Sequence, residues 1–329
     1  MAFIKYSSIT NSYDNIFIEK VKFACAEQKF FGPWYISEKI HGANCQISYD
    51  EEGFHIGCRN SYDIPKSWVN VLGKYEPNLK NVYENVGKQV VLYGEFFGGS
   101  YPHADVPRNP NASRVQKGIF YTPNNEALFY DFLIAGDGFL GVEGLKELSK
   151  LYDIPIVDFI QVETLDEALK YPNNEPSEIY KRYGLPEIEG NIREGVVIKP
   201  AISLYAGQSR IIIKNKNDRF KEVSRCPKVV LPPEELDEKT KVALEKALAY
   251  ITEERVINCL SHFGSEPDMT VLGNLIKETN QDVINSFEND NNDFGSMEKI
   301  EIKKVTKRVN TMVAKLCKEV LIKKMSGEL

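Results

Sequence analysis

The fold of this chain is decided between residues 34 and 49, where the sequence is Trp34-Tyr35-Ile36-Ser37-Glu38-Lys39-Ile40-His41-Gly42-Ala43-Asn44-Cys45-Gln46-Ile47-Ser48-Tyr49. Two apolar segments typical of β-strands flank a short polar element that carries a lysine and, three residues later, a glycine. A lysine at the end of a strand, beside a glycine that lets backbone or ligand approach closely, suits a covalent nucleophile. Because Lys-x-x-Gly is a common pattern, this interpretation depends on the rest of the chain.

The composition is that of an ordinary globular protein. The chain has 329 residues, of which 42% are hydrophobic and 27% are charged, and its length favours two domains. No apolar run approaches the ~20 residues that span a bilayer, and the first residues lack the basic and apolar segments of a signal peptide. We therefore expect a cytoplasmic protein (host-cell cytoplasm if it is viral) without a membrane partner, and a monomer by default.

Cysteine and histidine spacing argues against a structural metal or a disulfide framework. The six cysteines contain no Cys-x-x-Cys pair, and the four histidines form no ligand-like spacing with them. The cysteines are best interpreted as reduced packing residues. The net charge of -6 argues only weakly against a nucleic-acid partner, because the distribution of charge decides the matter.

Periodicity and turn signals predict an N-terminal part that mixes strands and helices. Predicted strands lie within 34–49 in two segments and at 54–59, 89–99, 128–134 and 210–217. Predicted helices lie over 15–24, with Asn15 as a candidate cap, and over 142–152. Others follow Ser177 and Thr164, where Thr-Leu-Asp-Glu fits a capping box. Residues 100–126 are rich in Pro and Asn, which predicts a surface loop or a flexible lid.

The composition changes near Pro227 and Pro232-Pro233, after which only helical periodicity is found. Helices are expected over 240–251, 253–263, 269–287 and 297–325. We therefore predict an α+β fold, with one domain over residues 1–230 and a smaller all-α domain over 231–329. In addition to Lys299, the last helix carries eight basic residues, which suits contact with a nucleic-acid backbone. They are Lys303, Lys304, Lys307, Arg308, Lys315, Lys318, Lys323 and Lys324.

Side chains that could take part in catalysis or ligand binding lie at the predicted strand ends. They are the nucleophile candidate Lys39, the carboxylates Glu95 and Glu194, the aromatic Tyr130, and the cations Arg59, Lys199, Lys214 and Lys216. This inventory suits nucleotidyl transfer, because a lysine amine attacks phosphorus only when deprotonated, and neighbouring cations with a divalent metal lower its pKa. Cations also neutralise developing phosphoryl charge, a carboxylate can hold the metal, and an aromatic ring can cover the base.

Six motifs follow one another with sensible gaps. They are Lys39-Ile40-His41-Gly42, Arg59, Gly94-Glu95-Phe96, Phe129-Tyr130-Asp131, Glu194-Gly195-Val196-Val197-Ile198-Lys199 and Lys214-Asn215-Lys216. This series resembles the covalent nucleotidyltransferases, and specifically the RNA ligase 2 family of bacteriophage and trypanosome editing ligases. The resemblance covers residues 1–225 well and the helical tail more loosely, where Arg255 and Asp282 match family positions only with gaps and receive no role.

The resemblance implies an ATP-grasp-like nucleotidyltransferase domain built on antiparallel sheets, and an ATP-dependent RNA ligase activity. Lys39 would react with ATP and carry AMP covalently, with Mg²⁺ or Mn²⁺ as the metal. The adenylate would pass to an RNA 5′-phosphate, and the adjacent 3′-OH would then displace AMP. The expected substrate is a nick in duplex RNA or in an RNA–DNA hybrid.

The same resemblance assigns roles to the site residues. Glu194 would organise the metal, Arg59 would hold phosphate, Glu95 the ribose hydroxyls, and Tyr130 would stack on adenine. Lys199, Lys214 and Lys216 would surround the adenylate and the α-phosphate. His41 and Asn44 would support later steps, and Glu38 and Ile40, which flank the nucleophile, would contact the nucleotide. Two departures are Ala43, where phage relatives carry a hydroxyl residue, and Tyr130 in place of phenylalanine.

Three alternatives stay open. DNA ligases and capping guanylyltransferases usually have Asp in place of His41 and append an OB-type barrel, whereas this tail is predicted to be helical. A nucleic-acid-binding relative without activity is opposed by the complete set of chemical positions. A structural reading makes Glu95 a solvent-facing turn residue, Glu194 and Lys199 a surface ion pair, and Lys214 and Lys216 a solvated edge. It suits each group separately and the ordered set poorly.

Overall fold

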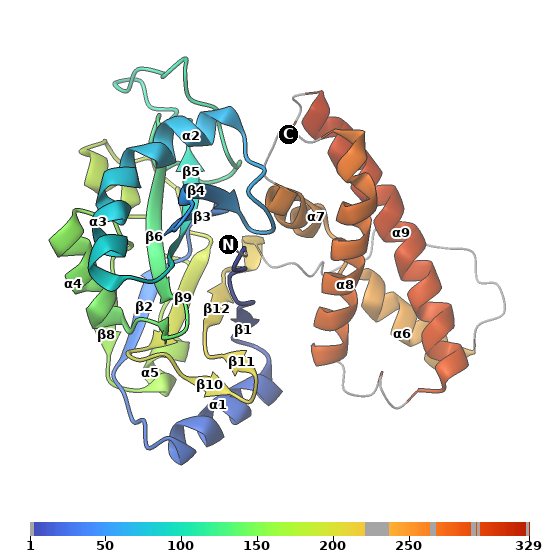
Figure 1. Ribbon diagram of the computed structural model, residues 1–329. Coiled ribbons are helices and arrows are strands. Elements are labelled where there is room, and N and C mark those ends of the chain that lie inside the picture. The colour runs from blue at the N-terminus through green and yellow to red at the C-terminus, as the bar shows by residue number, and fades with distance from the viewer. Residues whose placement is uncertain (1–2, 221–236, 264–267, 291–293, 295–296, 327–328) are drawn as a thin grey trace. The chain divides into compact units, whose positions relative to one another are not determined.

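The computed structural model describes residues 3–220, 237–263, 268–290, 294, 297–326 and 329. The chain divides into two compact units, Met1–Arg219 and Phe220–Leu329, shown in Figure 1. All strands of the described residues lie in the first unit, and the described part of the second is helical. The predicted α+β class is confirmed. The predicted boundary near residue 230, with Pro227 and Pro232-Pro233, lies outside the described residues.

The first unit is built on two five-stranded sheets. The strands are β1 (Thr10–Asn11), β2 (Trp34–Glu38), β3 (Ala43–Asp50), β4 (Gly53–Cys58), β5 (Val90–Gly98), β6 (Asn125–Ile134), β7 (Gly138–Phe139), β8 (Ile160–Val162), β9 (Gly195–Pro200) and β12 (Ile213–Lys216), with β10 (Tyr205–Ala206) and β11 (Ser209–Arg210) forming a separate hairpin. One sheet has the order β1-β12-β9-β2-β8 and the other β4-β3-β5-β6-β7. Neighbouring strands are antiparallel except for the pair β1 and β12.

The stretch around Lys39 passes from one sheet to the other. β2 lies beside β9 in the first sheet, and β3 lies between β4 and β5 in the second. Residues 39–42 connect them. The connection needs glycine at position 42, because a Cβ there would lie 2.3 Å from the carbonyl oxygen of Phe96, well inside van der Waals contact.

Helices cover one face of each sheet. The first sheet packs against α1 (Asn15–Glu27) and α5 (Leu165–Lys170), and the second against α2 (Lys66–Leu72), α3 (Glu76–Val86) and α4 (Val142–Tyr152), as Figure 1 shows. Alternate residues of β3, Cys45 and Ile47, enter the second core. Their neighbours Asn44 and Gln46 therefore lie on the opposite face, which leads to the site described below.

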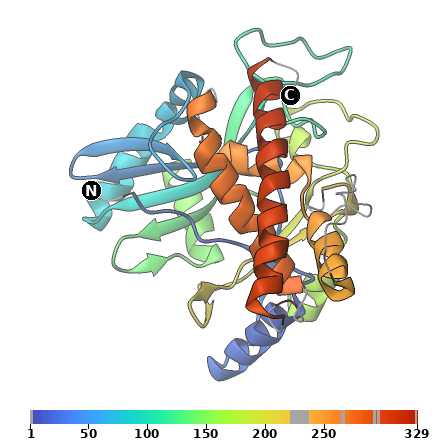
Figure 2. The same ribbon diagram turned by 90° about the vertical axis from the view of Figure 1, so that its right-hand side faces the viewer.

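The second unit contains α6 (Glu238–Leu248), α7 (Glu253–Leu260), α8 (Leu272–Asp290) and α9 (Lys299–Met325). Figure 2 shows α9 alongside α8. The buried face of α9 repeats every three or four residues at Val305, Val309, Val313, Cys317 and Val320, the spacing of a helix with one apolar face. Seven of its lysines are exposed: Lys299, Lys303, Lys304, Lys307, Lys315, Lys318 and Lys323.

Several local predictions can be compared with the structure. The capping box at Thr164 is confirmed, since Thr164 Oγ1 accepts from Glu167 N at 3.2 Å. The first helix begins at Asn15, but its cap is Asp14, whose Oδ1 accepts from Phe17 N at 2.9 Å. The segment after Ser177 is a 3₁₀ helix over Ile179–Tyr183.

Residues 100–126 are not a surface loop throughout. Tyr101, Ile119, Tyr121 and Thr122 are buried, so this segment contributes packing as well as surface. In the described parts of the chain, none of the helices combines the length and apolar character that a bilayer crossing requires.

Candidate active site

Three charged residues meet at one end of the first sheet. Lys39 follows β2, Glu194 precedes β9, and Lys216 ends β12, and these strands are neighbours in the sheet. The backbone fixes their register, because Lys39 N donates to Gly195 O at 2.9 Å and Asn217 N donates to Glu194 O at 2.9 Å. Strand pairing therefore brings together residues that are far apart in the sequence.

Glu194 forms the centre of this cluster and is only 2% exposed. Lys39 Nζ donates to Glu194 Oε2 at 2.9 Å, and Lys216 Nζ lies 3.0 Å from Glu194 Oε1. His41 Nδ1 lies 3.3 Å from Oε2. One buried carboxylate is thus flanked by two ammonium groups and an imidazole, which excludes the surface ion pair and the solvated edge for Glu194 and Lys216.

The charges of the two lysines keep Glu194 ionised. Burial by itself would raise the pKa of this carboxyl group, but the Coulombic attraction of Lys39 and Lys216 outweighs it and holds the pKa well below the usual range. An ionised carboxylate at this position attracts positive charge. It can therefore position the nucleophilic lysine or contribute to binding a divalent cation.

The second sheet supplies Glu95, which faces the Lys39 cluster. Asn44 of β3 is the cross-strand partner of Glu95 on β5. Burial raises the pKa of Glu95 to about 7, while the positive charges of Lys39 and Arg59 act in the opposite direction. Glu95 therefore titrates near neutral pH and is not a solvent-facing turn residue. Arg59 directly follows β4, which pairs with β3.

Tyr130 lies on β6 and is linked to the same face through Asn44, whose Nδ2 donates to the phenol oxygen. Burial raises the pKa of the phenol well above its usual value, so the hydroxyl stays neutral. Tyr6 packs near Tyr130 with a ring-centroid distance of 5.3 Å. The phenol thus has a hydrogen-bond partner of its own.

Lys199 has a different environment from the other cations. Its Nζ donates to Tyr130 O at 2.6 Å and lies 3.6 Å from Asp131 Oδ1. Among the described residues, its hydrogen bond and ion pair are with this segment of β6 and not with Glu194. Burial lowers the pKa of Lys199, and the charge of Asp131 opposes that effect. The strand register places the backbone of Lys214 opposite Val197 of β9.

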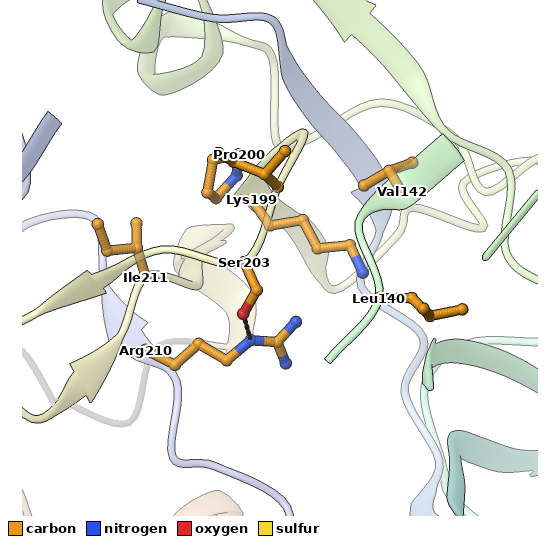
Figure 3. Close-up of a pocket in the computed structure, with 8 residues that line it drawn as sticks. Leu140, Val142, Lys199, Pro200, Ser203, Arg210 and Ile211 are labelled. Atoms are coloured by element: carbon orange, nitrogen blue, oxygen red, sulfur yellow. Dashed lines mark hydrogen bonds between the residues drawn. The ribbon is translucent and has the colours of Figure 1, made fainter. Parts of the chain in front are cut away.

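Asp131, the residue after Tyr130 on β6, is the centre of a buried ionic network. Arg210 donates to both carboxylate oxygens of Asp131 at 2.5 and 3.0 Å, and Tyr6 OH donates to Asp131 Oδ2 at 2.8 Å. Figure 3 shows Lys199 and Arg210 lining one small pocket, where Arg210 Nε donates to Ser203 Oγ at 3.2 Å. The pocket belongs to this network and not to the Lys39 cluster.

The network gives a stability prediction. Asp131→Asn would leave the buried Arg210 and Lys199 without their counter-charge, and we expect a loss of about 3–5 kcal/mol in the free energy of unfolding. Urea unfolding at neutral pH measures it. Glu126→Gln, which removes the partner of the exposed Lys74 in a pair at 3.2 Å whose carboxylate is partly exposed, is the control and should change stability by less than about 1 kcal/mol. Equal effects of the two variants would contradict the prediction.

Several residues that support the site were not predicted from the sequence. Arg210 gave no signal, since nothing in a single sequence pairs it with Asp131, which lies 79 residues earlier. Asn217 directly follows the motif that contains Lys216, and its Nδ2 donates to Arg193 O at 2.5 Å. Asparagine beside a charged motif is a usable but weak signal, because its side chain often bonds to nearby backbone.

Two family models match the chain and place it among the ligases. The model of RNA ligase matches residues 32–221, which is more than half of the 329 residues. The model of the T4 RNA ligase 2 C-terminal domain matches residues 234–315. The chain therefore belongs to the RNA ligase family, and the resemblance to the RNA ligase 2 family is confirmed.

Solved structures of Naegleria gruberi RNA ligase are similar at a low level. A mutant with AMP and Mn has 13% identity and a TM-score of 0.47, over 67% of this chain and 58% of that chain. The ligase with PPi has 12% identity and a TM-score of 0.44, over 67% and 58%. The chain thus spans less than two thirds of the length of these structures, and the family assignment rests on the two family models.

Proposed function

We propose that the protein is an ATP-dependent RNA ligase that joins a 3′-OH to a 5′-phosphate through AMP carried on Lys39. The observation that supports this most strongly is the cluster in which Lys39 and Lys216 flank the buried carboxylate of Glu194. A lysine such as Lys39, held by an ionised partner in a chain of the RNA ligase family, suits a covalent nucleophile.

In the first proposed step, the Lys39 amine loses a proton and attacks the α-phosphorus of ATP. A phosphorus–nitrogen bond forms, the bond to the bridging oxygen breaks, and pyrophosphate leaves. In the second step an RNA 5′-phosphate oxygen attacks the same phosphorus and releases the lysine. In the third step the 3′-OH attacks the adenylylated 5′-phosphate, and AMP departs as the phosphodiester forms.

A divalent cation fits the residues of the cluster. Glu194 is an ionised and buried carboxylate, and Mg²⁺ is commonly held by one or two carboxylates together with substrate phosphates. Its two oxygens are paired with Lys39 and Lys216, so an ion would have to share or replace one of these contacts. When bound, such an ion supplies charge neutralisation at the phosphoryl oxygens. We propose Mg²⁺ or Mn²⁺ with Glu194 as its protein ligand.

The nucleotide is proposed to lie between the two sheets. Arg59 would hold phosphate, Glu95 the ribose, and Tyr130 the base. The remaining proposed nucleotide contacts are Glu38, Ile40, Lys199, Lys214 and Lys216, with His41 and Asn44 supporting later steps. Glu38 accepts from Glu178 N at 3.3 Å, and burial raises its pKa to about 7. Lys199 would act from beside Tyr130, where its ammonium is bound.

The direct test of the function is incubation of the protein with ATP and magnesium, followed by intact-mass measurement. We expect a gain of one AMP. An adduct of GMP from GTP instead would favour a capping guanylyltransferase, and preferential sealing of nicked DNA would favour a DNA ligase. A correctly folded protein that forms no adduct would be an inactive relative, and the proposal would be wrong.

The helical unit is proposed to position RNA, with α9 as the backbone contact. A truncated chain ending at Pro232 should still adenylylate itself, because the Lys39 cluster lies in the first unit, but should seal nicked duplex RNA roughly tenfold or more slowly. Gel assays of sealing, with nicked RNA and RNA–DNA hybrids in parallel, measure the effect and the strand preference. Unimpaired sealing by the truncated chain would remove the helical unit from this role. Cytoplasmic location and a monomeric state remain expectations.

A further inference from the structure

A partly buried segment from the loop after β5 reaches the turn that carries the nucleophile. We define it as the bridging segment, residues 116–122. Tyr121 is 1% exposed, and its hydroxyl oxygen accepts from His41 N at 2.8 Å. Gln116 Nε2 donates to Gly42 O at 3.2 Å. The turn at 39–42 is therefore bonded to this segment on both sides of the peptide between His41 and Gly42.

The same segment is also hydrogen-bonded to the turn that precedes Glu194. Asn191 Oδ1 accepts from Phe120 N at 2.9 Å, and Asn191 Nδ2 donates to Phe120 O at 2.7 Å. Asn191 is 5% exposed and lies three residues before Glu194 in the chain. Both polar atoms of one buried amide are thus used to hold the backbone next to Tyr121.

The bridging segment is itself firmly held. The Tyr121 ring packs edge-on against Phe97 of β5, with centroids 5.2 Å apart and planes at 75°. It therefore connects two turns that belong to different parts of the sequence, since Lys39 and Glu194 are separated by 155 positions. Small displacements of reacting groups cost large factors in rate, so a rigid link between these turns has a direct chemical consequence.

We propose that Tyr121 is a positioning residue for lysyl-adenylate formation, and that Asn191 is its counterpart on the Glu194 side. Tyr121 holds the backbone N–H of His41, and Asn191 holds the backbone that leads to Glu194. Together they keep the distance and orientation between the Lys39 amine and the Glu194 carboxylate. The inference rests on the proposed function and deepens it, because it assigns a role within the first chemical step to residues outside the reacting groups.

Tyr121→Phe tests the proposal, because it keeps the ring and removes the oxygen that accepts the His41 N–H. We expect the rate of adduct formation at saturating ATP to fall by about tenfold or more, while the ATP concentration for half-maximal rate changes less than about threefold. This division separates positioning from loss of nucleotide binding. The adduct is followed by intact mass over time.

Tyr93→Phe is the matched control. Tyr93 is fully buried, and its hydroxyl donates to Ile4 O at 2.9 Å, away from the nucleophile turn. Both variants lose one buried hydroxyl bonded to backbone, so a similar change in thermal stability is expected. Only Tyr121→Phe should slow adduct formation. Equal slowing in both variants, or none in either, would overturn the proposal.

Asn191→Ala provides the second measurement and decides the question if Tyr121→Phe does not fold. It should also lower the saturating rate while leaving the half-saturating ATP concentration near that of the wild type. If Asn191→Ala matches the wild type, the bridging segment does not position Glu194, and the proposal is wrong. A wild-type protein that forms an adduct keeps the proposed function in either case, whereas no wild-type adduct overturns both.

Discussion

Lys39→Ala is expected to form no AMP adduct, a loss of at least about 10⁴-fold in the rate of self-adenylylation. The amine of Lys39 is the proposed nucleophile, and alanine leaves no group that can form the phosphorus–nitrogen bond. Incubation with ATP and magnesium, followed by intact-mass measurement, should show one AMP on the wild type and none on the variant.

Lys39→Ala should remain folded, so a missing adduct can be attributed to the missing amine. Removing Lys39 leaves Glu194 with Lys216, 3.0 Å from its other oxygen, so the buried carboxylate keeps one counter-charge and the protein should stay folded. Lys74→Ala is the control, because Lys74 is a largely exposed lysine paired with Glu126. It should be labelled like the wild type. An adduct that persists in Lys39→Ala would locate the nucleophile elsewhere.

The sequence predicts segments well where the signal is local. The helix over 142–152 has the predicted limits, because its apolar residues recur at helical spacing. The cap of the first helix was one residue off, since Asp14 and Asn15 are both good capping residues and only the backbone geometry selects between them. Boundaries between adjacent capping residues cannot be decided from sequence pattern alone.

Contacts between distant segments limit how much of the site can be predicted from the sequence. The motif order predicted one gathered set of residues; Lys39, Glu194 and Lys216 lie together, whereas Lys199 is bonded to β6. The partner of Lys199 was not predictable, because its ion pair with Asp131 depends on how β9 meets β6 across two sheets. The burial of Tyr121 was missed for the same reason, since a Pro- and Asn-rich segment gives no periodic signal.

Glu194→Gln is expected to abolish adduct formation and to lower the free energy of unfolding by about 3–5 kcal/mol at neutral pH. Glutamine has nearly the same shape but no charge, so Lys39 and the buried Lys216 would face each other without a counter-charge. Globular proteins of this kind have about 5–15 kcal/mol of stability, so the variant should remain folded. Far-UV circular dichroism with urea unfolding checks this before labelling is measured.

The pH dependence separates the charge of Glu194 from its shape. Its pKa is held well below the ordinary value of 4.5 in the folded protein, so its charge stabilises the fold fully above that value and progressively less as pH falls below it. The stability difference between wild type and Glu194→Gln should therefore be constant near neutral pH and shrink in acid. A difference that does not shrink would assign the effect to packing. Adduct formation by a folded Glu194→Gln at the wild-type rate would exclude Glu194 as the metal ligand. Lys39 and Lys216 would then have to act on the nucleotide without this carboxylate.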